Sequence, residues 1–475
     1  MVRKRGGKSD LSGIRKAPTG IDGLDEVTAG GFPAGRPTLL CGHAGCGKTV
    51  LAMEFLINGA AKYNEPGLFV SFEEDQSELR ANFASFGPNL KDLMRRKRIA
   101  IDYIPVERSE IMETGEYDLE GLFVRLAHAV DAIGAKRVAL DTIEALFSGF
   151  SNAGILRAEL RRLFRWLKSK GLTAVVTGER GENTLTRHGL EEYVADCVIL
   201  LDHLVSDRIA TRRLKIVKYR GSTHGTNEFP FLISKDGVSI LPVTSLELCH
   251  GASTERVSSG VASLDLMFGG KGYYRGSSIL VSGSPGSGKT SLAAHFVDAA
   301  CRRGEKCAFF SFEESPAQVM RNMASVGFDL GKWVDKGLLR MECWRPTAYG
   351  LEKHLADIHR TVEAFGPRCV ALDPISGFIP VGAPSEVKSM LLRIVDYLKT
   401  RFITTLITDL VPASVEEDCY GSGISSIADT WLSVTTKTVR ESRERVFSIV
   451  KSRGMDHSAR IVKLVITNKG VRLEA

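Results

Sequence analysis

The sequence predicts an α/β fold of two tandem domains, each a mostly parallel sheet flanked by helices. Three observations support this prediction. The chain has 475 residues, which is more than one hydrophobic core usually holds. Segments of its first half recur 232 to 241 residues later. Within each half, short apolar runs alternate with amphipathic stretches, which is typical of the strands and helices of α/β proteins.

The internal repeat sets the expected domain boundaries. The stretch GIDGLDEVTAGGFPAGRPTLLCGHAGCGKT at 20–49 aligns with GVASLDLMFGGKGYYRGSSILVSGSPGSGKT at 260–290. The pattern restarts around residue 247, which indicates that one domain has been duplicated. We expect a basic flexible tail over 1–16 and domains over 17–247 and 248–475.

Near-continuous apolar runs predict strands that are buried on both faces of a parallel sheet. In the first half these are TLLCG at 38–42, GLFVSF at 67–72, RVALD at 137–141 and TAVVTG at 173–178. Apolar residues at helical spacing predict helices over 48–63 and 158–171. Because ligands of such folds gather at the carboxyl ends of the strands, we expect the functional site there.

Composition excludes several classes of protein. With 43% apolar and 25% charged residues the chain is globular, and the net charge of +7 permits anionic ligands without requiring nucleic acid. The nine cysteines form no CxxC pairs, so neither a zinc ribbon nor a disulfide framework is expected. We see no apolar run long enough to span a membrane and no signal peptide, and we expect a reducing cytoplasm.

Two segments match the GxxxxGK[ST] pattern of phosphate-binding loops: GHAGCGKT at 42–49 and GSPGSGKT at 283–290. Each follows a predicted strand and opens a predicted helix, so that backbone N–H groups can surround phosphates at the helix N-terminus. A glycine-rich turn alone would not explain two copies in register. The predicted nucleotide-binding residues of these loops are Gly42, Gly45, Cys46, Gly47, Lys48 and Thr49 in the first half and Gly283, Gly286, Ser287, Gly288, Lys289 and Thr290 in the second.

Acidic residues follow two further strands of each half. Asp141 and Asp373 end the runs RVALD and CVALD, and we expect them to orient Mg²⁺ together with Thr49 and Thr290. No glutamate follows either aspartate, so the general base must come from elsewhere. The SFEE segments supply carboxylates at the end of the second strand of each half. The predicted catalytic residues are therefore Glu73, Glu74, Glu313 and Glu314.

A third motif, Lys-x-Arg-Gly-x-x-His, occurs at 218–224 and at 451–457. Together with the phosphate loops, the aspartate strands and the FEE segments, these copies resemble the RecA-like KaiC family of circadian clock ATPases. The resemblance covers nearly the whole chain from residue 17. It implies ATP and Mg²⁺ as ligands and a homo-hexameric ring with nucleotide at the subunit interfaces. It also implies that cations of one subunit reach the γ-phosphate of the next, namely Lys218, Arg220, Lys451 and Arg453, with His224 and His457 nearer the base or ribose.

The two halves differ at one place that the resemblance makes informative. Glu192 and Tyr193 of the first half align with Ser425 and Ser426 of the second. In the KaiC family, adjacent hydroxyl residues at this place of the second domain are autophosphorylated, so Ser425 and Ser426 are the predicted phosphoacceptors. The resemblance thus implies an ATPase in the first domain and a serine autokinase, with autodephosphorylation, in the second. A solvated Ser-Ser loop is the alternative.

The resemblance also bears on partners. It implies a timing or signalling switch that acts with a KaiB-like partner. The clock protein of the family continues with a tail that recruits its activator, whereas this chain stops at Ala475. We therefore do not expect a KaiA-like partner at such a tail.

Two other functions remain open at this point. RecA/DnaB-like nucleic-acid motors need basic channel loops. GENTLTRH at 181–188 offers little positive charge and VPASVEEDCYG at 411–421 is acidic, which disfavours a motor. A nucleotide-gated scaffold without turnover is disfavoured by the intact glutamates.

Overall fold

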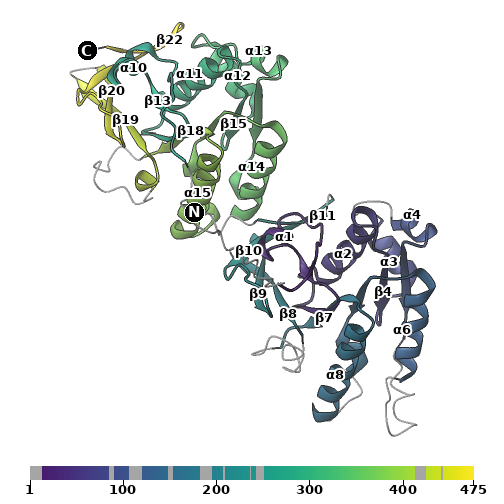
Figure 1. Cartoon of the computed structure of the whole chain (residues 1–475). Coiled ribbons are helices and arrows are strands. Elements are labelled where there is room, and N and C mark those ends of the chain that lie inside the picture. The colour runs from purple at the N-terminus through teal and green to yellow at the C-terminus, as the bar shows by residue number, and fades with distance from the viewer. Residues whose placement is uncertain are drawn as a thin grey trace, which may run out of the picture. The chain divides into compact units, whose positions relative to one another are not determined.

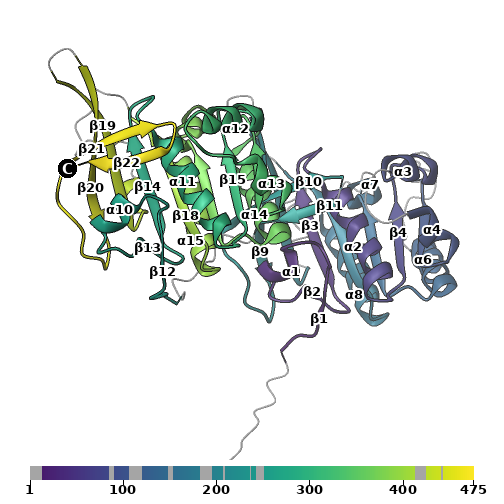
Figure 2. The same ribbon diagram turned by 90° about the horizontal axis from the view of Figure 1, so that it is seen from above.

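The chain divides into two compact units, which are described separately (Figures 1 and 2). One consists of Met1–Ser206 and Ala210–Ser245, and the other of Asp207–Ile209 and Leu246–Ala475. The predicted boundary at residue 247 and most of the predicted N-terminal tail lie outside the described residues. The computed structural model describes residues 13–84, 90–105, 120–147, 153–181, 195–206, 209–235, 237–241, 251–411, 424–439 and 442–474.

The first unit is built on a nine-stranded sheet of order β11-β10-β9-β8-β3-β7-β6-β4-β5. The strands from β8 to β5 are parallel, and β10 pairs antiparallel with both β9 and β11. The strands are β3 (Pro37–Gly42), β4 (Gly67–Ser71), β5 (Ile99–Tyr103), β6 (Arg137–Asp141), β7 (Thr173–Glu179), β8 (Cys197–Ser206), β9 (Ile209–Tyr219), β10 (Glu228–Ser234) and β11 (Gly237–Ile240). The helices are α1 (Leu24–Val27), α2 (Lys48–Lys62), α3 (Gln76–Asn82), α4 (Leu90–Arg95), α6 (Glu120–Ile133), α7 (Ile143–Phe147) and α8 (Ala153–Ser169), and a small sheet joins β1 (Lys16–Ala17) to β2 (Phe32–Pro33).

Helices cover both faces of this sheet. Leu40 of β3 packs in one core cluster with residues of α2, such as Phe55. The neighbouring Leu39 points to the opposite face, where it packs with residues of α6 and α8, such as Leu160. Alternate residues of one strand thus enter different cores, which explains why the strand sequences are continuously apolar.

The second unit repeats this topology strand for strand. Its nine-stranded sheet has the order β16-β15-β17-β18-β14-β19-β20-β21-β22, which is the order of the first sheet read from β5 to β11. The two sheets confirm the predicted α/β fold. The strands are β14 (Ser278–Gly283), β15 (Cys307–Ser311), β16 (Leu339–Cys343), β17 (Cys369–Asp373), β18 (Thr404–Leu410), β19 (Thr430–Val439), β20 (Ser442–Ser452), β21 (Val462–Thr467) and β22 (Gly470–Glu474). The α-helices are α10 (Ala262–Met267), α11 (Lys289–Arg302), α12 (Pro316–Ala324), α13 (Gly331–Asp335), α14 (Leu351–Phe365) and α15 (Pro384–Thr400), with 3-10 turns η1 (Pro346–Ala348), η2 (Ile375–Val381) and η4 (Ile424–Ser426), and β12 (Arg256–Val257) pairs with β13 (Tyr273–Tyr274).

In the part of the chain that the structure describes, no helix combines the length and the apolar character needed to cross a membrane.

Each unit has a buried arginine guanidinium in its core, but the arginine comes from a different position of the repeat in each unit. Arg137 at the start of β6 is fully buried and bonds Glu65 at 2.7 Å. The corresponding first residue of β17 is Cys369, and the guanidinium comes instead from Arg275, which pairs with Glu305. Burial would make an unpaired cation very costly, so the acidic partner is present in both units.

A second buried polar contact fixes the strand next to the phosphate-loop helix. In the first unit a carboxylate oxygen of Glu54 accepts the Val238 N–H at 2.7 Å. In the second unit Nε2 of His295 accepts the Val471 N–H at 2.6 Å, while its Nδ1 lies 3.1 Å from Gly260 O. Only the neutral ring, protonated at Nδ1, satisfies both contacts, and burial lowers the pKa of His295 to about 4.

We therefore expect the second unit to lose stability as the pH falls. The pKa of His295 is lower in the folded unit than the usual value of about 6.5 in the unfolded chain, so the unfolded chain binds more protons between these values. The stabilisation is complete above about pH 6.5, and about 3 kcal/mol of it is lost by about pH 4. Urea unfolding of the second unit between pH 4 and 7 measures this. The variant His295→Gln should remove most of that pH dependence, whereas the exposed control His128→Gln should retain it. If the free energy of unfolding changed equally with pH in the two variants, the assignment to His295 would be wrong.

Candidate functional site

The first phosphate loop joins the end of β3 to the start of α2 and requires glycine at two points. Gly47 has a φ of 104°, and a Cβ there would lie 2.6 Å from Cδ1 of Ile233. A Cβ on Gly42 would lie 2.4 Å from Leu201 O. Lys48 is buried and its Nζ donates to Gly42 O at 2.8 Å. The loop therefore holds the lysine at the helix N-terminus, where a phosphate would bind.

The second loop, between β14 and α11, has the same construction. Gly288 has a φ of 105°, and a Cβ there would lie 2.7 Å from Cδ1 of Ile466. Lys289 Nζ donates to Gly283 O and Ser284 O, each at 2.8 Å. Burial lowers the pKa of Lys289, and the nearby carboxylates, Asp373 first among them, oppose that effect. The loop opens on a cavity of about 570 Å³, which is large enough for a nucleotide.

The loop residues that lie between these anchors differ in chemistry. Cys46 is fully buried, and burial raises the pKa of its thiol, so the group is a neutral packing residue. Ser287, at the equivalent position, is also buried. At Gly45 a Cβ would meet nothing within 4 Å. Its φ of 76°, and that of 71° at Gly286, favour glycine for conformational reasons alone.

Asp141 and Asp373 end the strands beside the loops, as predicted from the sequence. Each is buried, and burial raises the pKa of each carboxyl. In the first unit hydrogen bonds from Thr177 and Thr49 oppose this rise. In the second unit Thr408 and Thr290 make the equivalent bonds. Each loop threonine therefore lies beside a carboxylate, and this pair of oxygen donors suits a hard cation such as Mg²⁺. The hydroxyls of Thr177 and Thr408, which hold the aspartates, were not predicted.

The glutamate pairs follow β4 and β15 and are held by neighbours that differ between the units. Glu73 Oε1 accepts a hydrogen bond from Thr142 Oγ1 at 3.0 Å. The residue equivalent to Thr142 is Pro374, which has no hydroxyl, so Glu313 lacks this donor. By contrast, the second glutamate of each pair accepts from an asparagine amide in both units: Asn82 to Glu74 at 3.1 Å, and Asn322 to Glu314 at 3.2 and 3.3 Å.

The Lys-x-Arg segments do not approach the phosphate loop of their own unit. In the second unit Lys451 Nζ donates to Ser425 O, and Arg453 donates to Ser426 O at 3.0 Å. These residues lie next to the start of β19, and Thr430 pairs with Ile279 at the N-terminal end of β14. The phosphate loop follows the other end of β14, which is six residues long, so roughly 20 Å of strand separates the two sites.

The first unit has the same arrangement. Arg220 N donates to Asp196 O at 2.9 Å, immediately before β8 begins at Cys197. β8 runs parallel to β3, which places Arg220 and the neighbouring Lys218 at the end of the sheet away from the loop. His224 and His457 lie in the turns that follow, where each ring Nδ1 contacts a local carbonyl, Gly225 O at 2.9 Å and Met455 O at 3.3 Å.

An arginine that the sequence analysis missed does contact its own phosphate loop. Arg445 Nε donates to Gly286 O at 3.1 Å, and the side chain lines the cavity beside Lys289. Arg212 stands at the matching place, six residues before Lys218, as Arg445 stands six residues before Lys451. The signal was therefore present in the repeat, as it was for Asn82 and Asn322.

Several predicted features lie outside the described residues. These are Glu192 and Tyr193 and most of the two loops that were compared with the channel loops of nucleic-acid motors.

We expect the two phosphate loops to bind nucleotide independently. Replacing Lys289 by Ala removes the cation that donates to Gly283 O and Ser284 O of the second loop, so ATP binding there should weaken at least about tenfold. Equilibrium dialysis with labelled ATP should then count one tight site per chain instead of two, and Lys48→Ala should give the same count. Two tight sites in either variant would contradict the role of the lysine.

Comparison with known proteins agrees with this geometry. The family model described as "ATPase: KaiC" matches residues 17–245 and 257–475. The "Circadian clock protein KaiC2" of Synechocystis sp. is 54% identical over 460 residues, which are 96% of this chain and 81% of that protein. The "Circadian clock oscillator protein KaiC" of Prochlorococcus marinus is 37% identical over 473 residues, 99% of this chain and 94% of that protein. The resemblance inferred from the sequence is therefore confirmed, and the chain belongs to the KaiC family of nucleotide-binding ATPases.

Proposed function

We propose that the first unit hydrolyses ATP and that the second transfers the γ-phosphate of ATP to Ser425 or Ser426 of a neighbouring chain. The observation that carries this proposal is the position of the two serines. They lie beside Lys451 and Arg453 at the end of the sheet away from their own phosphate loop. A serine there cannot reach a γ-phosphate in the loop of its own unit, so we propose that another copy of the chain binds the donor ATP.

The proposal requires an assembly with nucleotide between chains. A homo-hexameric ring satisfies this requirement, because each chain then offers its loop to one neighbour and its Lys-x-Arg segments to the other. Each nucleotide would link two chains, so ATP should favour assembly by mass action.

The transfer step uses groups that the second unit provides. The serine Oγ attacks the γ-phosphorus, the bond to the β-γ bridging oxygen breaks, and ADP leaves. The serine proton passes to Glu313 or Glu314, whose carboxylates line the cavity with Lys289. Mg²⁺ bound through Thr290 and Asp373 would neutralise charge on the phosphates. Among the described residues no three His, Cys, Asp or Glu side chains gather as a metal site, so we expect the phosphates to complete the coordination.

The surroundings of the serines suit a phosphate product. Burial and the charge of Arg453 lower the pKa of Lys451. In the same region Lys399 pairs with Asp429 at 2.8 Å, whereas Lys451 and Arg453 donate to backbone carbonyls. A phosphoserine adds about −1.5 to −2 charge and would be attracted to the Lys451 and Arg453 cations. By family relationship we further propose a role in a cytoplasmic timing or signalling switch with a KaiB-like partner.

We expect hydrolysis and transfer to separate by unit. Replacing Glu73 and Glu74 by Gln removes the proposed base of the first unit, so ATP turnover should fall about 10²-fold or more while phosphate incorporation persists. Replacing Glu313 and Glu314 should have the reverse effect. The measurements are phosphate release and incorporation from γ-labelled ATP. If both double variants lost the two activities alike, the division of labour would be wrong.

Transfer between chains can be tested by mixing two variants. One variant cannot donate phosphate, and the other cannot accept it. Lys289→Ala keeps the serines but loses the second nucleotide, whereas Ser425→Ala with Ser426→Ala keeps the nucleotide but loses the acceptors. Neither should be labelled alone. After co-assembly, label should appear on the Lys289→Ala chain at residues 425–426. Label on the Ser→Ala chain would place the acceptor elsewhere, and no label in the mixture despite assembly would refute transfer between chains.

A further inference from the structure

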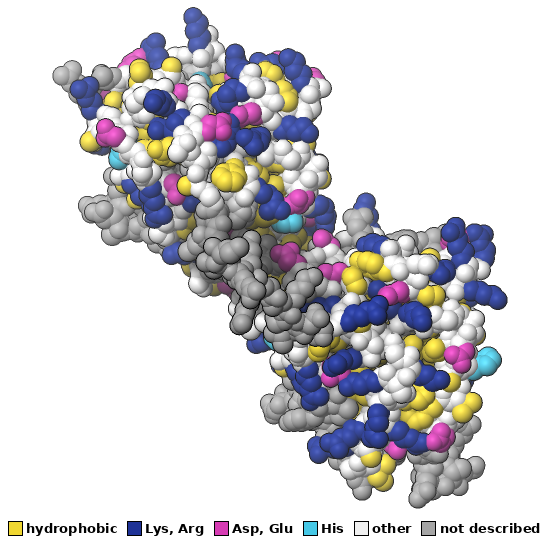
Figure 3. All heavy atoms as spheres, in the orientation of Figure 1, with side chains coloured by type: hydrophobic (Ala, Val, Ile, Leu, Met, Phe, Trp, Pro, Cys, Tyr) yellow, Lys and Arg dark blue, Asp and Glu magenta, His cyan; other side chains and the backbone are white. Residues whose placement is uncertain are grey.

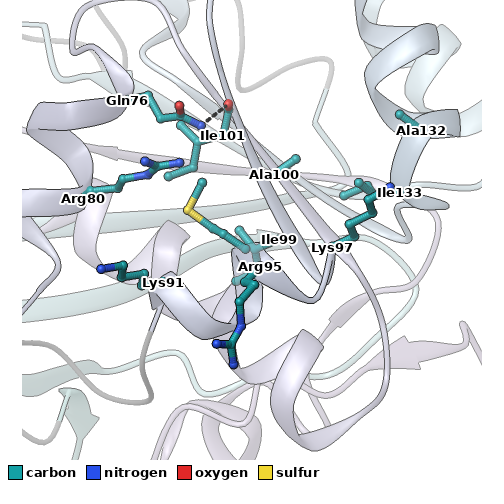
Figure 4. A pocket seen from close by; sticks show the side chains of 11 residues that line it. Gln76, Arg80, Lys91, Arg95, Lys97, Ile99, Ala100, Ile101, Ala132 and Ile133 are labelled. Atoms are coloured by element: carbon teal, nitrogen blue, oxygen red, sulfur yellow. Dashed lines mark hydrogen bonds between the residues drawn. The ribbon is translucent and has the colours of Figure 1, made fainter.

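The first unit contains a second pocket, of about 490 Å³, at the edge of its sheet (Figure 4). It lies between α3, α4, β5 and the C-terminal end of α6. β5 is the outermost strand, four strands away from β3 and its phosphate loop, which corresponds to about 19 Å. The pocket is therefore separate from the nucleotide site.

The floor of this pocket is apolar and its rim is cationic. The floor is formed by apolar residues, namely Met94, Ile99, Ala100, Ile101 and Ile133. The charged side chains of the lining are all basic: Arg80, Lys91, Arg95 and Lys97. In Figure 4 Arg80 stands at one side and Lys97 at the other, beside Ile133. Lys and Arg side chains also gather on the surface in the region of α4 (Figure 3).

Among the described residues of the unit, most of this positive charge has no acidic partner. Arg95 pairs with Asp92, which also pairs with Arg96 at 2.8 Å. The side chains of Arg80, Lys91 and Lys97 form no hydrogen bond or ion pair with any residue that the structure describes. Three cations around an apolar floor suit an organic anion, because they supply charge for phosphates and a surface for an apolar group.

An added β-strand is a poorer occupant. Two carbonyls of β5 are already used by side chains: Ile101 O accepts from Gln76 at 3.2 Å, and Tyr103 O accepts from Arg125 at 2.7 Å. A peptide strand would have to displace both donors to pair with this edge.

The duplicated unit shows that the fold does not need these cations. The equivalents of Arg80, Lys91, Arg95 and Lys97 lie 240 residues later and are Met320, Gly331, Asp335 and Gly337. Lys97 is also in the left-handed region, with a φ of 56°, where the second unit has Gly337 at 67°. A lysine at such a position is less stable than glycine, so folding stability alone does not favour its presence.

We propose that this pocket binds a small organic anion that carries phosphate groups, and that binding restrains α3 and thereby slows hydrolysis in the first unit. α3 carries Gln76 and Arg80 at the pocket and Asn82 at its end, where the amide holds Glu74 at 3.1 Å. Fixing α3 keeps the Glu74 carboxylate on this amide and away from a water proton. The effect on hydrolysis rests on the proposed role of Glu73 and Glu74, whereas binding itself does not.

The test uses the full chain with both phosphate loops saturated by a non-hydrolysable ATP analogue and Mg²⁺. The probes are adenosine 3′,5′-bisphosphate and inorganic pyrophosphate, followed by calorimetry. We expect one additional site per chain. If the bisphosphate binds more tightly than pyrophosphate, the apolar floor contributes to binding. If the two probes bind equally, the pocket recognises the phosphate groups alone. The absence of saturable binding of either probe below about millimolar concentration would overturn the proposal.

Variants locate the site. Arg80→Met with Lys97→Gly installs the residues of the second unit and should weaken binding at least about tenfold. Arg161→Ala with Lys170→Ala removes the same charge from exposed positions in and just after α8 and should leave binding unchanged. Equal affinity in the two double variants would also overturn the proposal, and single variants at 80 and 97 guard against misfolding.

Coupling is measured separately. With ATP, the bisphosphate should lower turnover of the wild type at least about twofold but not that of Arg80→Met with Lys97→Gly. The Glu73→Gln with Glu74→Gln variant should still bind the probe. Binding without a fall in turnover would refute the coupling alone, and loss of binding in the Glu→Gln variant would refute the separateness of the pocket.

Discussion

The direction of the parallel strands is the constraint on which the functional arrangement depends. In a parallel sheet the C-terminal ends of all strands lie at the same end of the sheet. The phosphate loop, the aspartate and the glutamates of a unit therefore meet there. In the second unit the Lys-x-Arg segment begins in the last residues of β20, which runs antiparallel to β19 and therefore finishes at the opposite end of the sheet. No rearrangement of side chains can bring Lys451 to Lys289, because a whole strand length separates them. The topology therefore keeps the Lys-x-Arg cations away from the phosphate loop of their own unit.

Duplication shows which contacts this arrangement requires. The loop lysines, the aspartates with their threonine donors and the asparagine-held glutamates occur in both units. Other buried contacts differ between the units. Glu54 and His295 accept equivalent backbone N–H groups. The buried guanidinium is that of Arg137 in β6 of the first unit and that of Arg275, just after β13, in the second. The side chains at the phosphate loops are thus the same in both units. The side chains that only pair buried polar groups in the core are of different residue types in the two units.

Much of the fold and of the phosphate-loop sites could be predicted from the sequence, because local sequence patterns determine them. Apolar runs and helical spacing predicted the sheet and its covering helices, and the repeat predicted two copies. The repeat marks Arg445 by its match with Arg212, but the contacts of Thr177 with Asp141 and of Arg445 with Gly286 could not be predicted from local patterns. These contacts join residues far apart in the chain, so the sequence does not show which partner each side chain has. The pairing of Lys451 and Arg453 with the serine carbonyls is also visible only in three dimensions.

The cationic ends of the two units differ in a way that bears on their proposed roles. In the first unit Arg220 lies 3.8 Å from Asp196, and Lys168 contacts the same carboxylate at 2.5 Å. In the second unit Lys399 keeps the equivalent contact with Asp429, but Lys451 and Arg453 turn to the neutral carbonyls of Ser425 and Ser426. A carbonyl orients a cation without cancelling its charge, whereas a carboxylate cancels it. Lys451 and Arg453 therefore keep their positive charge beside the serines, where a transferred phosphate would need it. The charge is reduced at the equivalent place in the unit for which we propose hydrolysis.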